Sequence, residues 1–187
     1  RVQSLRGRSA RVLAVLLAAE LVCAGRAAAH DEPINQIAAL TLQIGAEPGN
    51  AVLYLRRGEL HRLDREFSAA LADYASARRL DPSLVIAELG AGRALLQAER
   101  PAEARPVLER YVRERPRDAE GRLELARTLV LLRETKNADS EYARAIALAP
   151  QPSPDLYFER ARFLREVGRE SAAIRVLDRG IARLGPL

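Results

Sequence analysis

Few side chains in this 187-residue sequence are of the types that carry out catalysis or hold a metal ion. The chain has one cysteine, Cys23, and two histidines, His30 and His61. His61 stands near Glu59 and Asp64, but one histidine with two acidic residues is a weak spacing for metal ligands, so we expect His61 to pack between helices. The serines and threonines have no histidine nearby in sequence to act as a base, and no glycine-rich phosphate loop occurs. We therefore predict no catalytic residue, no metal, no cofactor and no enzymatic activity.

Pairs of residues four positions apart recur along the chain and form a candidate binding site, because residues with this spacing share one face of a helix. An apolar residue comes first and a charged residue follows. The predicted site residues are Leu55 and Glu59, Leu89 and Arg93, Leu123 and Arg127, and Phe158 and Arg162. An apolar row beside three arginines suits an extended segment of a protein partner with apolar and acidic side chains. Alternatively, the charged residues only solvate the helices or form ion pairs within the chain. The acidic residues available for such pairs are Glu120, Glu124, Asp155 and Glu159.

A sequence period of about 34 residues, the length of a known class of helical repeat, indicates which elements position these pairs. One such step leads from Gly58 to Gly92, and the same step relates three further sets: Ala70, Ala104 and Ala138; Tyr74, Leu108 and Tyr142; and Pro82, Pro116 and Pro150. A period of this length is typical of tandem helical hairpins, since one hairpin cannot bury its apolar face alone. Small residues at matching places, which also include Ala126, Ala161 and Ala173, allow the paired helices to approach closely.

The repeated unit is similar to the tetratricopeptide repeat, whose pattern is W-x2-L-G-x2-Y, then A-x3-F, then P. The first unit has Tyr54, Gly58, His61, Ala70, Tyr74 and Pro82 at the corresponding places. The Trp, Leu and Tyr places are altered, whereas the small residues and the proline agree with the pattern. The resemblance implies an all-α fold, an α-solenoid of helix-turn-helix repeats wound as a right-handed superhelix. It also implies a concave groove, lined by the first helices of successive hairpins, in which a peptide lies.

The period divides the chain into units. Residues 51–84, 85–118, 119–152 and 154–187 form repeats one to four, with helices expected near 51–64 and 67–80 in the first. Residues 30–50 precede them, and an amphipathic helix over 34–45 is expected to cover the open end of the first repeat. The turn at residues 134–137 has no glycine and is expected to be the least regular.

Residues 1–29 have the pattern of a secretory signal peptide. An arginine-rich start is followed by an apolar run that is short for a membrane span, and then by three alanines that end at Ala29. Cleavage after Ala29 would leave a mature chain without cysteine. The alternatives are an uncleaved leader or a lipid on Cys23, and only these would attach the chain to a membrane.

The leader also carries most of the net charge of +5, because it has five arginines and one glutamate. The rest of the chain is nearly neutral and has few aromatic residues, so no nucleic acid is expected as a partner. We expect an exported, non-catalytic scaffold or adaptor for protein–protein interactions in the periplasm or at the cell surface of a bacterium. The alternatives are a membrane-tethered subunit of an envelope complex, or an accessory subunit that positions a partner enzyme.

The last helix has apolar residues at helical spacing: Ile174, Leu177, Ile181 and Leu184. An array of this kind usually ends with a helix whose outer face is polar, because the last hairpin otherwise presents an uncovered apolar stripe. We expect moderate exposure of this stripe. The exposure favours weak formation of a homodimer through the last helix, or docking of a partner there.

Overall fold

The computed structural model describes residues 35–185, and every regular element in that range is an α-helix. The predicted signal peptide, Cys23 and His30 lie outside the described residues. The chain divides into two compact units, the first ending at Pro48 and the second starting at Gly49. The first unit contains a helix over residues 35–46. Its predicted role as a cover for the first repeat stays a prediction.

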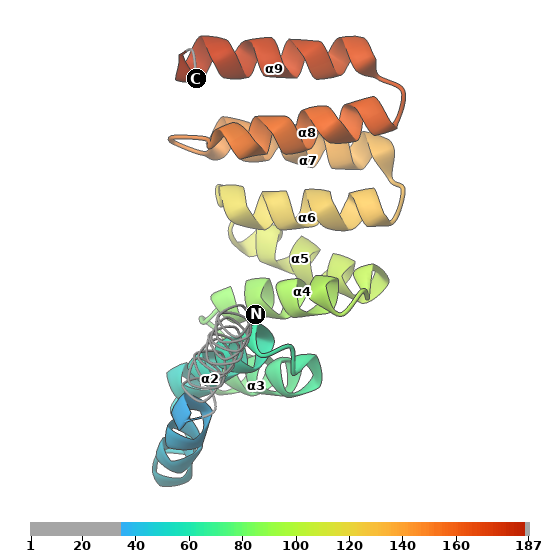
Figure 1. Ribbon diagram of the computed structural model, residues 1–187. Helices are drawn as coiled ribbons and strands as arrows, with labels where there is room; N and C mark the ends of the chain where they lie inside the picture. Colours follow the sequence, from blue (N-terminus) through green and yellow to red (C-terminus); the bar gives the residue numbers. More distant parts are fainter. Residues whose placement is uncertain (1–34, 186–187) are drawn as a thin grey trace, which may run out of the picture. The chain divides into compact units, whose positions relative to one another are not determined.

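The second unit consists of eight helices that form four consecutive pairs (Figure 1). Two helices fall within each residue range predicted for a repeat. The first helices of the pairs are α2 (Ala51–Leu63), α4 (Ile86–Gln97), α6 (Ala119–Leu131) and α8 (Pro154–Glu166). The second helices are α3 (Phe67–Leu80), α5 (Pro101–Glu114), α7 (Thr135–Leu148) and α9 (Glu170–Leu184). This arrangement confirms the predicted all-α solenoid of helix-turn-helix repeats.

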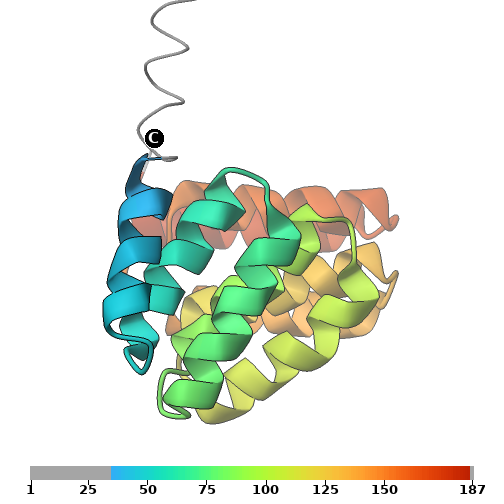
Figure 2. The same ribbon diagram turned by 90° about the horizontal axis from the view of Figure 1, so that it is seen from below.

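The helices of the second unit stack in sequence order (Figure 1), and in Figure 2 the later helices lie behind the earlier ones. The main contacts join the two helices of one pair, or a second helix with the first helix of the next pair. Such an array has no central core, because each pair is buried by its neighbours. Contact between α7 and α8 is less extensive than between α3 and α4 or between α5 and α6.

Local sequence explains where several helices begin. The side chain of Asn50 accepts a hydrogen bond from the backbone N–H of Val52 and caps α2. Asp118 caps α6 in the same way by accepting from the N–H groups of Glu120 and Gly121. Such caps satisfy backbone donors that the first helical turn leaves free. Helices α5 and α8 instead begin with a proline, whose missing N–H costs nothing at that position.

The turn inside each pair uses one residue in the left-handed conformation, always at the fifteenth place of its repeat. These residues are Arg65, Glu99, Arg133 and Gly168, with φ values of 64°, 58°, 60° and 75°. Three of the four turns therefore accept the strain of a non-glycine residue with positive φ. An irregular turn was expected at residues 134–137, and this expectation is wrong, because Glu134 is the N-cap of α7 and residues 135–137 belong to that helix. The turn lies just before them, and its left-handed residue, Arg133, has the same place as those of the first two turns.

Small residues bring the paired helices together as predicted. Ala70, Ala104 and Ala138 are fully buried, and Ala173 is nearly so. Gly92 of α4 lies directly against Leu108 of α5, where an added Cβ would stand 2.6 Å from the Leu108 Cγ. A methyl group does not fit in that space, so the close approach of α4 and α5 requires glycine at this position.

Each acidic residue in the interior of the described chain is paired with an arginine. Asp73 accepts hydrogen bonds from Arg57 at 2.7 and 2.8 Å, and Glu141 accepts one from Arg122 at 2.9 Å. Glu88 and Glu124 are likewise paired, with arginines of neighbouring helices. A buried carboxylate without such a partner would be strongly destabilising. These pairs account for part of the high arginine content of the helices.

The helix packing predicts a large effect of enlarging Ala104. An Ala104→Leu substitution should lower the free energy of unfolding by about 1–3 kcal/mol, because the side chain overpacks the contact between two helices. Ala102 lies on the same helix but is exposed, so Ala102→Leu is the matched control and should change the free energy of unfolding little, since leucine is also a good helix former. Urea unfolding followed by circular dichroism measures both. Equal stability of the Ala104→Leu variant and the parent would contradict this account of the packing.

Candidate functional site

The eight predicted site residues lie two to a helix on α2, α4, α6 and α8. We call the surface of these four helices the first-helix face. The apolar members differ in burial: Leu89 is fully buried, Leu55 and Leu123 are half-buried, and Phe158 is 51% exposed. Leu89 therefore belongs to the core and cannot reach a ligand on the surface. The predicted apolar row is interrupted at α4.

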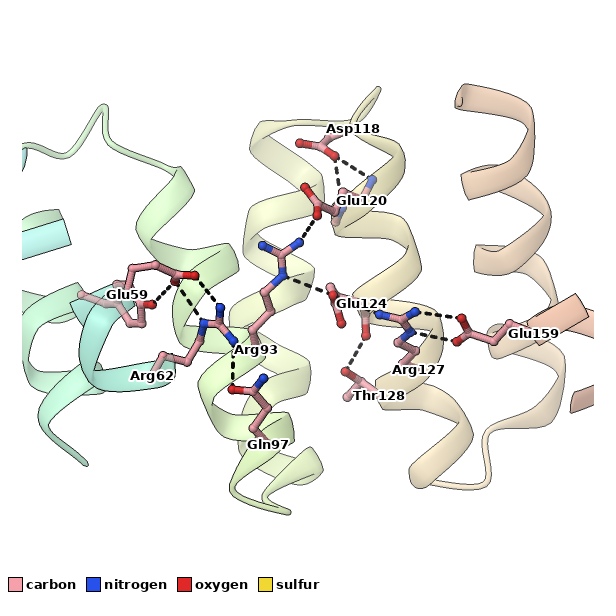
Figure 3. Close-up of polar contacts among 12 residues, drawn as sticks. Glu59, Arg62, Arg93, Gln97, Asp118, Glu120, Glu124, Arg127, Thr128 and Glu159 are labelled. Atoms are coloured by element: carbon pink, nitrogen blue, oxygen red, sulfur yellow. Dashed lines mark hydrogen bonds and ion pairs between the residues drawn. The ribbon is translucent and has the colours of Figure 1, made fainter. Parts of the chain in front are cut away.

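Two of the charged members, Arg93 and Arg127, are linked through acidic residues of α6 and α8 (Figure 3). Arg93 of α4 forms ion pairs with Glu120 and, at 3.2 Å, with Glu124 of α6. Arg127 of α6 pairs with Glu124 at 3.3 Å and with Glu159 of α8 at 2.8 Å. Ion pairing within the chain, one of the two interpretations of the arginine row, thus holds for Arg93 and Arg127. Asp155 is exposed and forms no ion pair within residues 35–185.

These ion-paired side chains form a polar layer on the first-helix face, made of Arg93, Glu120, Glu124, Arg127 and Glu159. Glu124 lies at its centre. Its side chain is only 10% exposed and lies between Arg93 and Arg127. Two positive charges compensate one buried negative charge, which would otherwise be strongly destabilising away from water. The two arginines therefore stabilise the fold, whatever else they bind.

Glu159 connects α6 with α8. Its oxygens accept two hydrogen bonds from Arg127, both 2.8 Å long, and one of 2.8 Å from the Tyr142 hydroxyl. Burial alone would raise the pKa of the Glu159 carboxyl, but the hydrogen bonds and the charge of Arg127 outweigh burial and hold this pKa below its ordinary value. The hydrogen bonds to Glu159 also raise the pKa of Arg127.

Arg62 and Gln97 extend the polar layer to α2, and the sequence did not identify either. Arg62 donates to Glu59 and to Gln97, in each case at 3.0 Å, and the Tyr74 hydroxyl donates to Glu59 at 2.7 Å. The hydrogen bond from Arg62 is the largest cause of the lowered pKa of Glu59. Glu59 and Arg62 are three apart on one helix, a spacing that could have indicated their pairing. Gln97 lies 35 residues beyond Arg62, so only the packed helices show that contact.

A pocket of about 430 Å³ opens on the first-helix face between α2, α4 and α6. Its lining residues are Arg62, Arg93, Leu96, Gln97, Glu124, Arg127 and Leu131. Arg127 has a side chain that is 42% exposed, and Leu131, one helical turn further along α6, is 57% exposed. The pocket thus offers guanidinium donors beside an apolar surface, a combination that binds polar and apolar side chains together.

His61 packs between α2 and α3 as expected, and its side chain is 14% exposed. Its Nδ1 lies 2.5 Å from a Glu66 oxygen and its Nε2 lies 3.8 Å from Asp73. Glu59 faces Arg62 instead, so the structure does not bring together the three residues of the weak metal motif. The described part of the chain has no cluster of three potential metal ligands. None of its helices is both long and apolar enough to cross a membrane.

The lowered pKa of Glu159 predicts how stability depends on pH. The unfolded chain takes up a proton at this carboxyl near pH 4.3, whereas the folded chain does so only at lower pH. The contribution of Glu159 to the free energy of unfolding is therefore complete above that pH and is lost as the pH falls through the folded pKa. A Glu159→Gln variant should lose about 1–3 kcal/mol at neutral pH and much less near pH 3.

Urea unfolding across this pH range measures the difference between the variant and the parent. Glu166→Gln is the matched control, because Glu166 is on the same helix, is 59% exposed and lies 3.9 Å from its arginine partner. This control should change stability little at either pH. An equal loss for Glu159→Gln at both pH values would show that the carboxylate charge is not what stabilises this contact.

Comparison with known proteins agrees with this architecture. Residues 85–128 match the tetratricopeptide-repeat family. MamA from Desulfovibrio magneticus RS-1 is 18% identical with a TM-score of 0.72, over 79% of this chain and 86% of that one. A tetratricopeptide repeat protein from Parabacteroides merdae ATCC 43184 is 16% identical with a TM-score of 0.67, over 84% and 61%. PilF of Pseudomonas aeruginosa is 20% identical with a TM-score of 0.61, over 76% and 64%. No curated protein matches the sequence.

At these identities the solved structures show a shared fold and no more. The family match covers residues 85–128, and the four helix pairs continue the same architecture over residues 51–184. These observations agree with the resemblance seen in the sequence. Residues 85–128 thus match a tetratricopeptide repeat, and residues 51–184 fold as an all-α solenoid of the kind seen in the solved tetratricopeptide repeat protein.

Proposed function

We propose that the chain is a non-catalytic scaffold that binds a segment of a protein partner on the first-helix face, over α6 and α8. The observation that carries the proposal is the pocket between α2, α4 and α6, together with the exposed residues that continue from it. Two apolar–arginine pairs are exposed on α6 and α8, and the α6 pair lines this pocket. Leu131 lies one turn from Arg127 on α6, and Phe158 lies one turn from Arg162 on α8.

Exposure of the arginine side chains increases along the array, from 25% at Arg93 to 42% at Arg127 and 67% at Arg162. Arg162 is also the least neutralised, because its ion pair with Glu166 spans 3.9 Å. The favoured partner therefore has an acidic residue close to an apolar one, so that the first meets Arg162 or Arg127 and the second meets Phe158 or Leu131.

Binding through these arginines should be weak and sensitive to salt. A carboxylate of the partner must compete with the acidic residues that already pair with Arg127, and the competing charges are close to solvent, where salt screens them. Scaffolds that exchange partners suit such an interface. The apolar contacts at Leu131 and Phe158 then supply the part of the affinity that does not depend on salt.

We also propose that the chain is exported by a bacterium. The support is the charge and apolar pattern of residues 1–29, which ends in three alanines. Export would place the scaffold in the periplasm or at the cell surface, where its partner would be another envelope or secreted protein.

The proposed binding face can be tested with charge-reversed variants. Changing Arg93, Arg127 and Arg162 together to glutamate is unsuitable, because two of them hold the buried Glu124. The sharper variant combines Leu131→Gln with Arg162→Glu, both at exposed positions. With the chain as bait in extracts of the cells that produce it, we expect recovery of the partner to fall at least about tenfold, which corresponds to about 1.4 kcal/mol.

The matched control for this capture experiment is Arg79→Glu with Arg113→Glu. Both arginines are exposed, and they occupy the same place on the second helices α3 and α5. The control should recover the partner as the parent does, and thermal unfolding should show that both variants are folded. Undiminished recovery by the Leu131→Gln, Arg162→Glu variant would reject the first-helix face as the binding surface.

Export predicts a defined change of mass. Intact-mass measurement of the chain recovered from the envelope fraction should show the loss of residues 1–29. Substituting Asp at Ala27 and Ala29 should block this loss, because signal peptidase needs small residues near the cut. An added lipid mass on Cys23, or an unchanged full-length mass, would instead support the tethered form of the protein.

A further inference from the structure

Helix α9 presents an apolar stripe that is largely uncovered within residues 35–185. Ile174 is 60% exposed, Ile181 is 56% exposed and Leu184 is 38% exposed, while Leu177 is half-buried. The stripe lines two adjoining pockets of about 680 and 370 Å³ between α8 and α9. A single exposed leucine is ordinary on a protein surface, but a continuous stripe over three helical turns marks an interaction surface.

The position equivalent to Ile181 is buried inside the array, where the next helix covers it. Val112 occupies in the second repeat the place that Ile181 occupies in the fourth, and it is only 6% exposed. Helix α6 covers it, since a Cβ on Gly121 would stand 3.5 Å from a Val112 methyl. The outer face of α9 is therefore of the kind that receives a helix elsewhere in this fold.

The spacing of the stripe favours pairing with another helix along one seam. Ile174, Leu177, Ile181 and Leu184 are separated by three, four and three residues, the alternation of a helix pair that packs along one seam. This spacing reads the same in both directions. A second copy of α9 running antiparallel would therefore place Ile174 opposite Leu184 and Leu177 opposite Ile181, and a twofold axis would relate the two halves.

We propose that α9 pairs antiparallel with α9 of a second copy of this chain. The pairing covers the stripe on both copies with one symmetric contact, and it closes on itself, so that it forms dimers and no fibres. The two pockets between α8 and α9 are filled by side chains from the second copy. Phe158 and Arg162 help to line these pockets, so the dimer covers the α8 part of the first-helix face. The α6 part, with Arg127 and Leu131, stays free on each copy.

One charge at the edge of the seam limits the strength of the dimer. Asp178 is exposed and lies one residue from Leu177. The twofold axis brings the two Asp178 side chains to the same side of the seam, where like charges repel. The contact also involves only α9 and the part of α8 that lines the two pockets, which is a small interface. The structure therefore points to a weak dimer that becomes stronger when this charge is removed.

Sedimentation equilibrium of the chain over a wide range of concentration tests the proposal. We expect a reversible monomer–dimer equilibrium. Ile174→Glu and Ile181→Glu should each raise the dissociation constant at least about tenfold, because each places a charge in the apolar seam. Both positions are more than half exposed, so the fold should accept the change. Ile86→Glu is the matched control, since Ile86 is 45% exposed at the start of α4, and it should leave the equilibrium unchanged.

Asp178→Asn tests the antiparallel arrangement itself, and it should lower the dissociation constant. A chain that stays monomeric at every concentration would overturn the proposal and leave the stripe to a helix of another protein. A dimer that neither isoleucine variant weakens would overturn it too, because the contact would then lie elsewhere. Neither result would bear on the α6 part of the first-helix face, because Arg127 and Leu131 do not line the two pockets between α8 and α9.

Discussion

Close approach of paired helices at small residues is the constraint on which the rest of this structure depends. Gly92 leaves no room for a methyl group beside Leu108, and Ala70, Ala104 and Ala138 are fully buried at the matching places of α3, α5 and α7. The same kind of contact recurs once in every repeat, so the helix pairs stack in a regular array. The regular stack in turn aligns the first helices and creates a face that a partner can bind.

Charge pairing between neighbouring repeats decides which part of that face is free. Glu124 is buried between Arg93 and Arg127, and Glu159 holds Arg127 from the next repeat (Figure 3). Arginines that occupy the same place in successive repeats therefore differ in their ion pairs and in their exposure. Arg93 mainly compensates a buried carboxylate, whereas Arg162 is largely exposed. The proposed binding surface lies toward α6 and α8 for this reason.

In the inner repeats, the next helix pair covers apolar side chains on the second helix, whereas α9 of the last described pair has no such cover. Positions that are buried in inner repeats, such as that of Val112, are exposed on α9, because no described helix lies against them. An exposed apolar stripe with symmetric spacing favours pairing with its own copy. The packing rule that builds the array thus also underlies the proposed contact between chains.

The sequence by itself determined the fold, because the repeat period and the small residues at matching places are local features that only stacked helical hairpins explain. It also identified the exposed stripe of α9 and the acidic partners Glu120, Glu124 and Glu159. Only the tertiary structure decided which of these partners each arginine meets, that Leu89 is buried, and that Gln97 joins Arg62. These contacts cross from one repeat to the next and depend on side-chain packing between helices that are far apart in the sequence. The sequence period indicates which face of a helix a residue occupies, but it does not indicate how deeply neighbouring helices bury that residue.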